Sequence, residues 1–257
     1  LASRRQRQMC IRDSFMAARE DDEWQVIPTP WILEAHDRWR SGQGDSPLAC
    51  IGLDVARGGR DDTVFAMRYG TWFDELVVVP GKETPDGPSV AALAASLLRE
   101  NAIVAVDSIG IGADAETALK NAGLPFEAMN GAEKATGHTR DGNFAFYNHR
   151  SEMWWRLREA LDPDYGFDVA LPPDPKLQAD LTAPTYSVRP GQPPKIYVEG
   201  KQDIVKRLGR SPDRGDAVVY GWNAGDLDVG PRARTRGRPG VGSTPPPVTD
   251  YDELRYG

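Results

Sequence analysis

Apolar residues follow two patterns along the chain, short continuous or alternating runs and longer runs with helical spacing. The short runs predict five strands, at Ala49–Val55, Thr63–Tyr69, Trp72–Val79, Ile103–Asp107 and Pro125–Met129. The longer runs predict helices over Ser89–Glu100, with Ser89 as N-cap, and over Ala113–Asn121 and Asn148–Leu161. This order of strands and helices predicts an α/β fold, a mixed sheet with antiparallel leading strands and flanking helices.

The second half of the chain is more polar. Gly131–Phe146 is long, polar and contains glycines, which predicts a mobile loop. Thr185–Arg189 and Lys195–Glu199 flank Pro190-Gly191-Gln192 and predict a hairpin. Two short helices are then expected, over Lys201–Leu208 and Ser211–Trp222.

Both ends of the chain differ in composition from the part between them. Arg4 to Ser14 reads RRQRQMCIRDS, the translation of a string that resembles a sequencing-library adapter, so we expect residues 1–14 to be a scar. Residues 15–44, with a short helix over Pro30–Trp39, are expected to be a linker, and residues 45–224 one domain. From residue 225 to residue 257 the chain is rich in Gly, Pro and Arg and predicts a disordered tail.

Composition restricts the class of protein. The chain has 257 residues, of which 40% are hydrophobic, so it can form a substantial core. No apolar run is long enough to span a membrane, and the two cysteines form neither a disulfide framework nor a metal-binding spacing. The formal net charge is -7, so a nucleic-acid site needs concentrated cations. One basic group is concentrated in the last third beside the last acidic cluster, and we expect its members to contact DNA phosphates: Lys195, Lys201, Lys206, Arg207, Arg210 and Arg214.

Carboxylates stand at three places where buried segments begin or end. Asp54 and Asp107 each end an apolar strand, and Asp213 and Asp216 open the last helix after Ser211-Pro212. Each carboxylate alone is more simply a turn or helix-capping residue. Together they predict a site for two Mg²⁺ or Mn²⁺ ions, because carboxylates at one sheet edge can hold two metals for phosphodiester hydrolysis.

The motifs make the chain similar to a known family. The stretches are VIPTPWILEAHDRW, IGLDVARGGRDDTV, AIVAVDSIGIGADA, NGAEKATG, SEMWWRLREAL, LPPDPKLQADLTAPTY and KRLGRSPDRGDAVVYGW, spanning about residues 23–224. They resemble the nuclease domain of a tailed-phage terminase large subunit, which has an RNase H-like (RuvC-like) fold. The resemblance implies a metal-dependent endonuclease that cuts concatemeric double-stranded DNA during packaging, in the host cytoplasm. It carries Asp54 and Asp107 over as metal ligands, with Asp216 favoured as the third and Asp213 in support.

The same resemblance implies partners and leaves two alternatives. Terminases usually carry an ATPase domain first, but no Gly-x-x-x-x-Gly-Lys-Ser/Thr is present, so we expect the chain to be the C-terminal part of a longer protein. The portal protein and the small terminase subunit are expected partners of the full-length protein, and no membrane is involved. The alternatives are a Holliday-junction resolvase-like nuclease, whose paired Asp SPDRGD also resembles, and a non-catalytic module that docks to DNA or portal.

Overall fold

A computed structural model describes residues 24–40, 45–56, 61–99, 101–108 and 112–225. The expected adapter scar and the tail from residue 226 onward lie outside these residues. The main sheet has six strands in the order β3-β2-β1-β5-β6, and β4 also pairs with β2. Its strands are β1 (Leu48–Asp54), β2 (Asp62–Tyr69), β3 (Trp72–Phe73), β4 (Val77–Pro80), β5 (Ile103–Asp107) and β6 (Phe126–Met129).

The pairing confirms the mixed sheet expected from the sequence. β2 runs antiparallel to β1, β3 and β4, whereas β5 runs parallel to both β1 and β6. The parallel pairs are joined through helices, as parallel strands require, since a short turn cannot return the chain to the same end of the sheet. The expected strand Trp72–Val79 is interrupted, because its two halves, β3 and β4, pair with opposite ends of β2.

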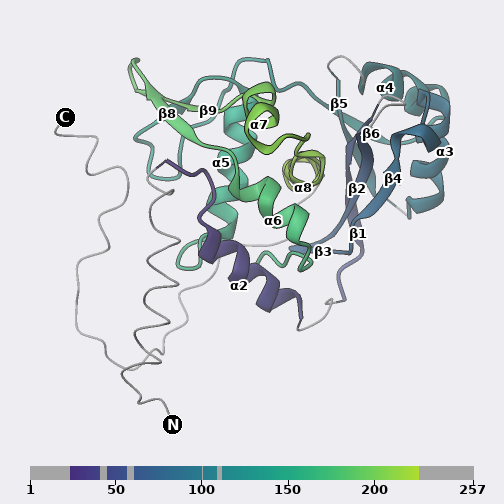
Figure 1. Ribbon diagram of the computed structural model, residues 1–257, viewed down its shortest axis with the longest axis horizontal. Helices are drawn as coiled ribbons and strands as arrows, with labels where there is room; N and C mark the ends of the chain where they lie inside the picture. Colours follow the sequence, from purple (N-terminus) through teal and green to yellow (C-terminus); the bar gives the residue numbers. More distant parts are fainter. Residues whose placement is uncertain (1–23, 41–44, 57–60, 100, 109–111, 226–257) are drawn as a thin grey trace, which may run out of the picture.

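Helices cover both faces of this sheet (Figure 1). One face packs against α3 (Gly87–Leu97) and α4 (Gly112–Asn121), and the other against α8 (Asp213–Asn223), behind which lie α5 (His149–Leu161) and α6 (Pro175–Thr182). Each face has its own hydrophobic core. Trp154 and Trp155 of α5 are fully buried in the larger core.

A second, three-stranded sheet stands beside the α8 side of the molecule. Its order is β7-β9-β8, with β7 (Ala145–Phe146), β8 (Tyr186–Arg189) and β9 (Lys195–Val198). The predicted hairpin is therefore present as β8 and β9, and α7 (Lys201–Leu208) follows it directly. The expected loop over Gly131–Phe146 is wrong at its end, because β7 pairs in parallel with β9. The segment is also held to α5, because the backbone N–H groups of Thr136 and Arg140 donate to the carboxylates of Glu152 and Glu159.

The segment assigned to a linker from the sequence packs onto the domain instead. α2 (Thr29–Trp39) lies along α5 and α6, and Val26, Ile27 and Ile32 are completely buried. Arg158 of α5 donates a hydrogen bond to the carbonyl oxygen of Val26 at 2.6 Å. The folded unit therefore begins by Trp24 rather than at residue 45. Apolar side chains in a short segment do not indicate which surface they pack against, so the burial of this segment was not predictable from the sequence.

Two helices differ from the sequence expectation, one in where it starts and one in that it was not predicted. α3 begins two residues early because Asp86, not Ser89, is its N-cap; the Asp86 side chain accepts from the Ser89 N–H at 2.9 Å. α6 was not predicted, although Asp174-Pro175, an N-cap followed by proline at the first helical position, marks its start. No helix in the described ranges is long and apolar enough to cross a membrane.

One glycine sets how closely α8 approaches the sheet. A Cβ atom at Gly52, in the middle of β1, would lie 1.9 Å from the carbonyl oxygen of Ala217 and 2.4 Å from the backbone nitrogen of Gly221. Backbone therefore packs on backbone between β1 and α8, which only glycine permits. This contact brings the first turn of α8 to the edge where β1 ends.

Candidate metal centre

Strand geometry places Asp54 and Asp107 together. Each ends its strand, and the two strands are parallel neighbours in which Leu53 pairs with Val106. Leu53 and Val106 point into the core under α3 and α4. Because side chains alternate along a strand, the next residues, Asp54 and Asp107, point to the opposite face, toward α8.

The start of α8 is held by a carboxylate from another helix. Asp180 of α6, fully buried, accepts hydrogen bonds from the backbone N–H groups of Arg214 at 3.1 Å and Gly215 at 3.3 Å. It also pairs with the Arg210 guanidinium at 2.6 Å. Pro212, the residue before the helix, makes no side-chain cap, so Asp180 takes that role. A helix start fixed in this way directs Asp213 and Asp216 at the sheet edge.

A lysine amine lies among the carboxylates. Nζ of Lys201, the first residue of α7, is 3.1 Å from Asp54 Oδ2, 3.1 Å from Asp216 Oδ2 and 3.4 Å from Asp213 Oδ1. Residues from β1, α7 and α8 thus meet at one cation. The sequence placed Lys201 on a DNA-binding surface; the structure places its amine within the acidic cluster instead.

Two further residues that sequence reasoning missed complete the cluster. Arg150, in the first turn of α5, donates to Asp216 Oδ1 at 3.0 Å, so the two oxygens of Asp216 face two different cations. The Tyr220 hydroxyl, one turn after Asp216, donates to Asp107 Oδ2 at 3.4 Å. The spacing Asp216–Tyr220 on one helix face was a signal for the tyrosine. No local pattern indicated Arg150, because its contact with Asp216 joins two separate helices, α5 and α8.

Burial and close contacts within the cluster shift the pKa values of three of its side chains. Burial, together with Asp216 and Asp213, raises the pKa of Asp54 well above its usual value, although Lys201 opposes this. Burial also acts on Asp216, but Arg150 and Lys201 outweigh it and hold the pKa of that carboxyl below its usual value. Burial and the carboxylates of Asp216, Asp107 and Asp54 raise the pKa of Tyr220 well above 10. All three acidic positions therefore act on one phenol.

The donor set fits a hard divalent cation. Oxygen ligands from carboxylates are what Mg²⁺ and Mn²⁺ take, and the position shared by Asp54, Asp213 and Asp216 already holds a positive charge, the Lys201 ammonium. No group of three or more acidic, His or Cys side chains in the described part of the chain is arranged ready to hold a metal. The carboxylates of Asp54, Asp213 and Asp216 surround the Lys201 amine, so a metal ion at the same oxygens would compete with Lys201.

We expect Lys201→Ala to tighten divalent metal binding. The variant removes a cation that occupies the oxygens a metal needs, so the apparent Kd for Mn²⁺ should fall by about tenfold or more. Isothermal titration without DNA measures this. Lys206→Ala is the control, because Lys206 lies on the same helix but pairs with exposed Asp203 at 2.7 Å. Weaker Mn²⁺ binding in the Lys201 variant would show that the amine supports the metal site.

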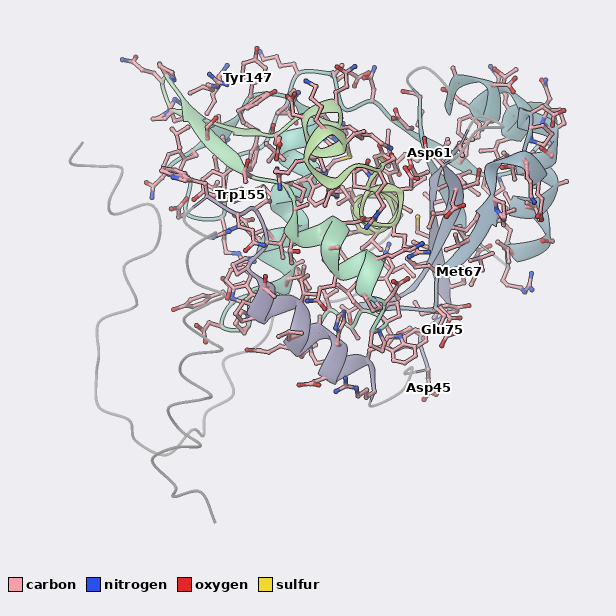
Figure 2. All side chains as sticks on the ribbon, viewed as in Figure 1. Asp45, Asp61, Met67, Glu75, Tyr147 and Trp155 are labelled. Atoms are coloured by element: carbon pink, nitrogen blue, oxygen red, sulfur yellow. The ribbon has the colours of Figure 1, made fainter. Side chains whose placement is uncertain are left out.

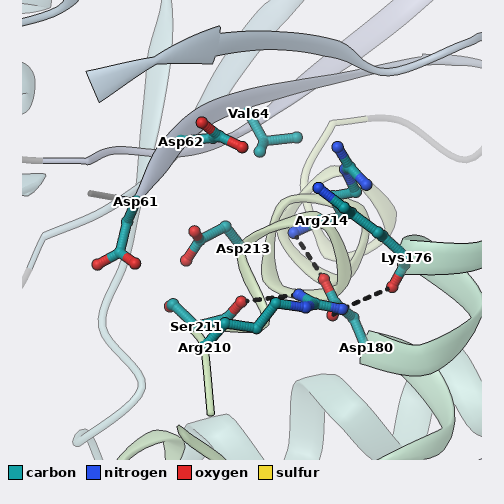
Figure 3. Close-up of a pocket in the computed structure, with 9 residues that line it drawn as sticks. All are labelled: Asp61, Asp62, Val64, Lys176, Asp180, Arg210, Ser211, Asp213 and Arg214. Atoms are coloured by element: carbon teal, nitrogen blue, oxygen red, sulfur yellow. Dashed lines mark hydrogen bonds and ion pairs between the residues drawn. The ribbon is translucent and has the colours of Figure 1, made fainter. Parts of the chain in front are cut away.

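A cavity of about 150 Å³ adjoins the cluster (Figure 3). Asp213 lines it and also reaches Lys201, so the cavity and the carboxylate cluster share a wall. Asp61 and Asp62 line one side together with Asp213. Three cations and one carboxylate line the other side: Lys176, Arg210, Arg214 and Asp180.

Most of the expected DNA-binding cations have carboxylate partners. Arg207 pairs with Glu199, Arg210 with Asp180, Arg214 with Asp174 at 3.3 Å, and Lys206 with Asp203. With Lys201 in the acidic cluster, Lys195 is the member of the group for which no ion pair is found within the described ranges. The group is thus a set of ion pairs around the site more than an uncompensated basic surface.

Comparison with known proteins gives the fold. No family model matches the sequence, and no curated protein matches it. The nuclease domain of the large terminase subunit gp2 of bacterial virus Sf6 superposes with a TM-score of 0.57 at 19% identity, covering 78% of this chain and 99% of that one. This chain has the fold of a large terminase nuclease domain. A lysine-to-alanine variant of the Sf6 domain, solved with manganese and β-thujaplicinol, superposes with a TM-score of 0.58 at 18% identity. The match covers 78% of this chain and 99% of that one. The similarity confirms the α/β fold expected from the motifs.

Proposed function

We propose that this chain is the nuclease of a phage genome-packaging machine, a metal-dependent endonuclease that cuts concatemeric double-stranded DNA. The observation that carries the proposal is the meeting of Asp54, Asp213 and Asp216 around one cation, with Asp107 on the neighbouring strand. These residues come from distant parts of the sequence, and burying several carboxylates together is costly unless cations bind them. The terminase nuclease fold supports the same reading, because Sf6 domains were solved with manganese and with calcium.

Asp54, Asp107, Asp213 and Asp216 are the residues that would hold the metals. When bound, two divalent ions supply charge stabilisation at the phosphate and lower the pKa of water. Arg150 fixes Asp216 through Oδ1 and leaves Oδ2 facing the shared position now taken by Lys201. Tyr220 orients Asp107 through its hydroxyl. Arg150, Lys201 and Tyr220 thus hold the carboxylates of Asp216 and Asp107 in position.

The surroundings favour weak sequence preference. Lysine and arginine side chains that hold a duplex through its phosphate oxygens gain no base information from those contacts, so we expect DNA binding here to be weakly sequence-dependent. The full-length protein is expected to act in the host cytoplasm with a portal protein and a small terminase subunit. A junction resolvase and a non-catalytic docking module remain the alternatives from the sequence. A module that only docks does not need four clustered carboxylates, which favours the nuclease.

We expect purified protein to nick supercoiled plasmid in Mn²⁺ or Mg²⁺ and to stop completely in EDTA. Agarose gels over a time course measure the conversion to nicked and linear forms. Linear duplex and four-way junction substrates, compared in the same buffer, separate the packaging nuclease from a resolvase. Cutting that persists in EDTA would contradict metal dependence, and cutting confined to junctions would contradict the packaging role.

A further inference from the structure

The outer face of the small sheet carries aromatic and cationic side chains together. Ile196 and Val198 of β9 are buried, so the alternate residues, Lys195 and Tyr197, point outward. Pairing extends this face onto both neighbours: Arg189 of β8 is opposite Lys195, and β7 runs parallel to β9 and leads into Tyr147. We call this surface, made of Tyr147, Arg189, Lys195 and Tyr197, the aromatic–basic face.

The rings on this face form a connected arrangement. Tyr147 and Tyr197 meet edge to face, with ring centroids 5.2 Å apart. The Arg189 guanidinium lies over the Tyr197 ring, 4.9 Å from its centroid. Tyr197 is thus packed by both neighbours, whereas 55% of Tyr147 is exposed beside the hairpin (Figure 2). An exposed aromatic ring held by a second ring offers a preformed surface for stacking.

The charges on this face call for an anion. Arg189 and Lys195 are directly opposite each other on paired strands, and like charges in that position repel. Neither forms an ion pair with a carboxylate anywhere in the described ranges. A phosphate bound between them would relieve the repulsion.

The aromatic–basic face is close along the chain to residues of the metal centre. Tyr147 precedes Arg150, which contacts Asp216, by three residues, and Tyr197 precedes Lys201 by four residues. The Cα atoms in each pair are therefore at most about 11–14 Å apart, the contour of three or four residues. In nucleic acid this corresponds to about three or four nucleotides at 3.4 Å per step.

We propose that the aromatic–basic face binds unpaired nucleotides of the DNA next to the cut, with a base stacked on Tyr147 and its phosphates held by Arg189 and Lys195. The proposal rests on the proposed nuclease function for the identity of the ligand. Exposed aromatic rings beside cations are the usual means of binding single strands, because every base has a face that can stack. A paired base inside a duplex cannot reach the ring, so the face prefers DNA with an unpaired segment.

Fluorescence anisotropy in EDTA tests the proposal without cutting. The probes are a blunt duplex and the same duplex with a single-stranded tail, in both polarities. Wild type should bind one tailed duplex at least about fivefold more tightly than the blunt one. Tyr147→Ala should remove this preference, and Tyr147→Phe should retain it because the ring remains. Tyr165→Ala is the matched control: Tyr165 is also 55% exposed but follows the C-terminal end of α5, whereas Tyr147 precedes its N-terminal end.

The cations are tested separately. Arg189→Ala with Lys195→Ala should weaken binding of the tailed duplex and lower the salt slope by about 1.4, the value for two phosphate contacts on a single strand. Equal binding of tailed and blunt duplex by wild type, or an unchanged preference in Tyr147→Ala, overturns the proposal. Unchanged DNA binding in all these variants also overturns it and assigns the face to a protein partner. Metal-dependent nicking by wild type is a separate readout, so the nuclease function stands or falls independently.

Discussion

Replacing Asp54 by asparagine is expected to abolish metal-dependent nicking while leaving the protein folded. Asparagine keeps the size of the side chain but removes the negative charge that a divalent ion requires. The rate should fall by at least about 10³-fold, equivalent to about 4 kcal/mol of transition-state stabilisation. Plasmid nicking in Mn²⁺ measures the loss.

The same substitution should change stability little. Burial and neighbouring carboxylates raise the pKa of Asp54, so its charge is costly in the metal-free protein. Lys201 keeps Asp213 and Asp216 as partners when Asp54 is neutral. The free energy of unfolding should therefore stay within about 1 kcal/mol of wild type. Asp203→Asn is the control, because Asp203 is an exposed carboxylate on the helix that carries Lys201. This variant should nick plasmid at the wild-type rate. Wild-type nicking by Asp54→Asn would remove Asp54 from the metal site.

Asp216 and Asp213 should differ in their effects. Asp216 is fully buried, whereas the Asp213 side chain is 13% exposed. Asp216→Asn should eliminate cutting, but it also weakens the partner of buried Arg150, so part of its effect is on the fold. For that reason Asp54 is the cleaner position for the test.

Gly52→Ala is expected to produce a large loss of stability from a single added methyl group. Its Cβ atom would lie 1.9 Å from the carbonyl oxygen of Ala217, and neither backbone can yield without moving α8 from the sheet. We expect the free energy of unfolding to fall by about 3–5 kcal/mol. Urea denaturation followed by tryptophan fluorescence measures this, since Trp222 lies on α8 and is buried.

Movement of α8 should also cost activity, because Asp216 lies on α8 and Asp54 lies two residues after Gly52. Folded Gly52→Ala protein at low temperature should therefore nick more slowly than wild type. Gly200→Ala is the matched control: φ at Gly200 is -71°, and its added Cβ would be no closer than 3.8 Å to another residue's heavy atoms. Its stability should stay within about 1 kcal/mol of wild type. A stable Gly52→Ala protein would show that β1 and α8 can separate.

Local patterns in the sequence determined the strands and most helices. Short apolar runs mark the strands, and Asp54 and Asp107 each stand at the end of such a run. Asp213 and Asp216 were also identifiable, because a helix start that carries two carboxylates after Ser-Pro has a recognisable pattern. These features depend on neighbours within one or two turns of the chain.

Contacts between distant segments decided the rest. Arg150 reaches Asp216 across 66 positions and Lys201 reaches Asp54 across 147, so no local pattern assigns their amines to the acidic cluster. Val26 and Ile27 are likewise buried in a core formed by distant segments, where Arg158, 132 positions along the chain, donates to the Val26 carbonyl oxygen. The sequence alone determined which carboxylates could bind metal, because charge is a property of each residue. Only tertiary packing decided that Arg150 and Lys201 contact those carboxylates, because proximity is a property of the fold.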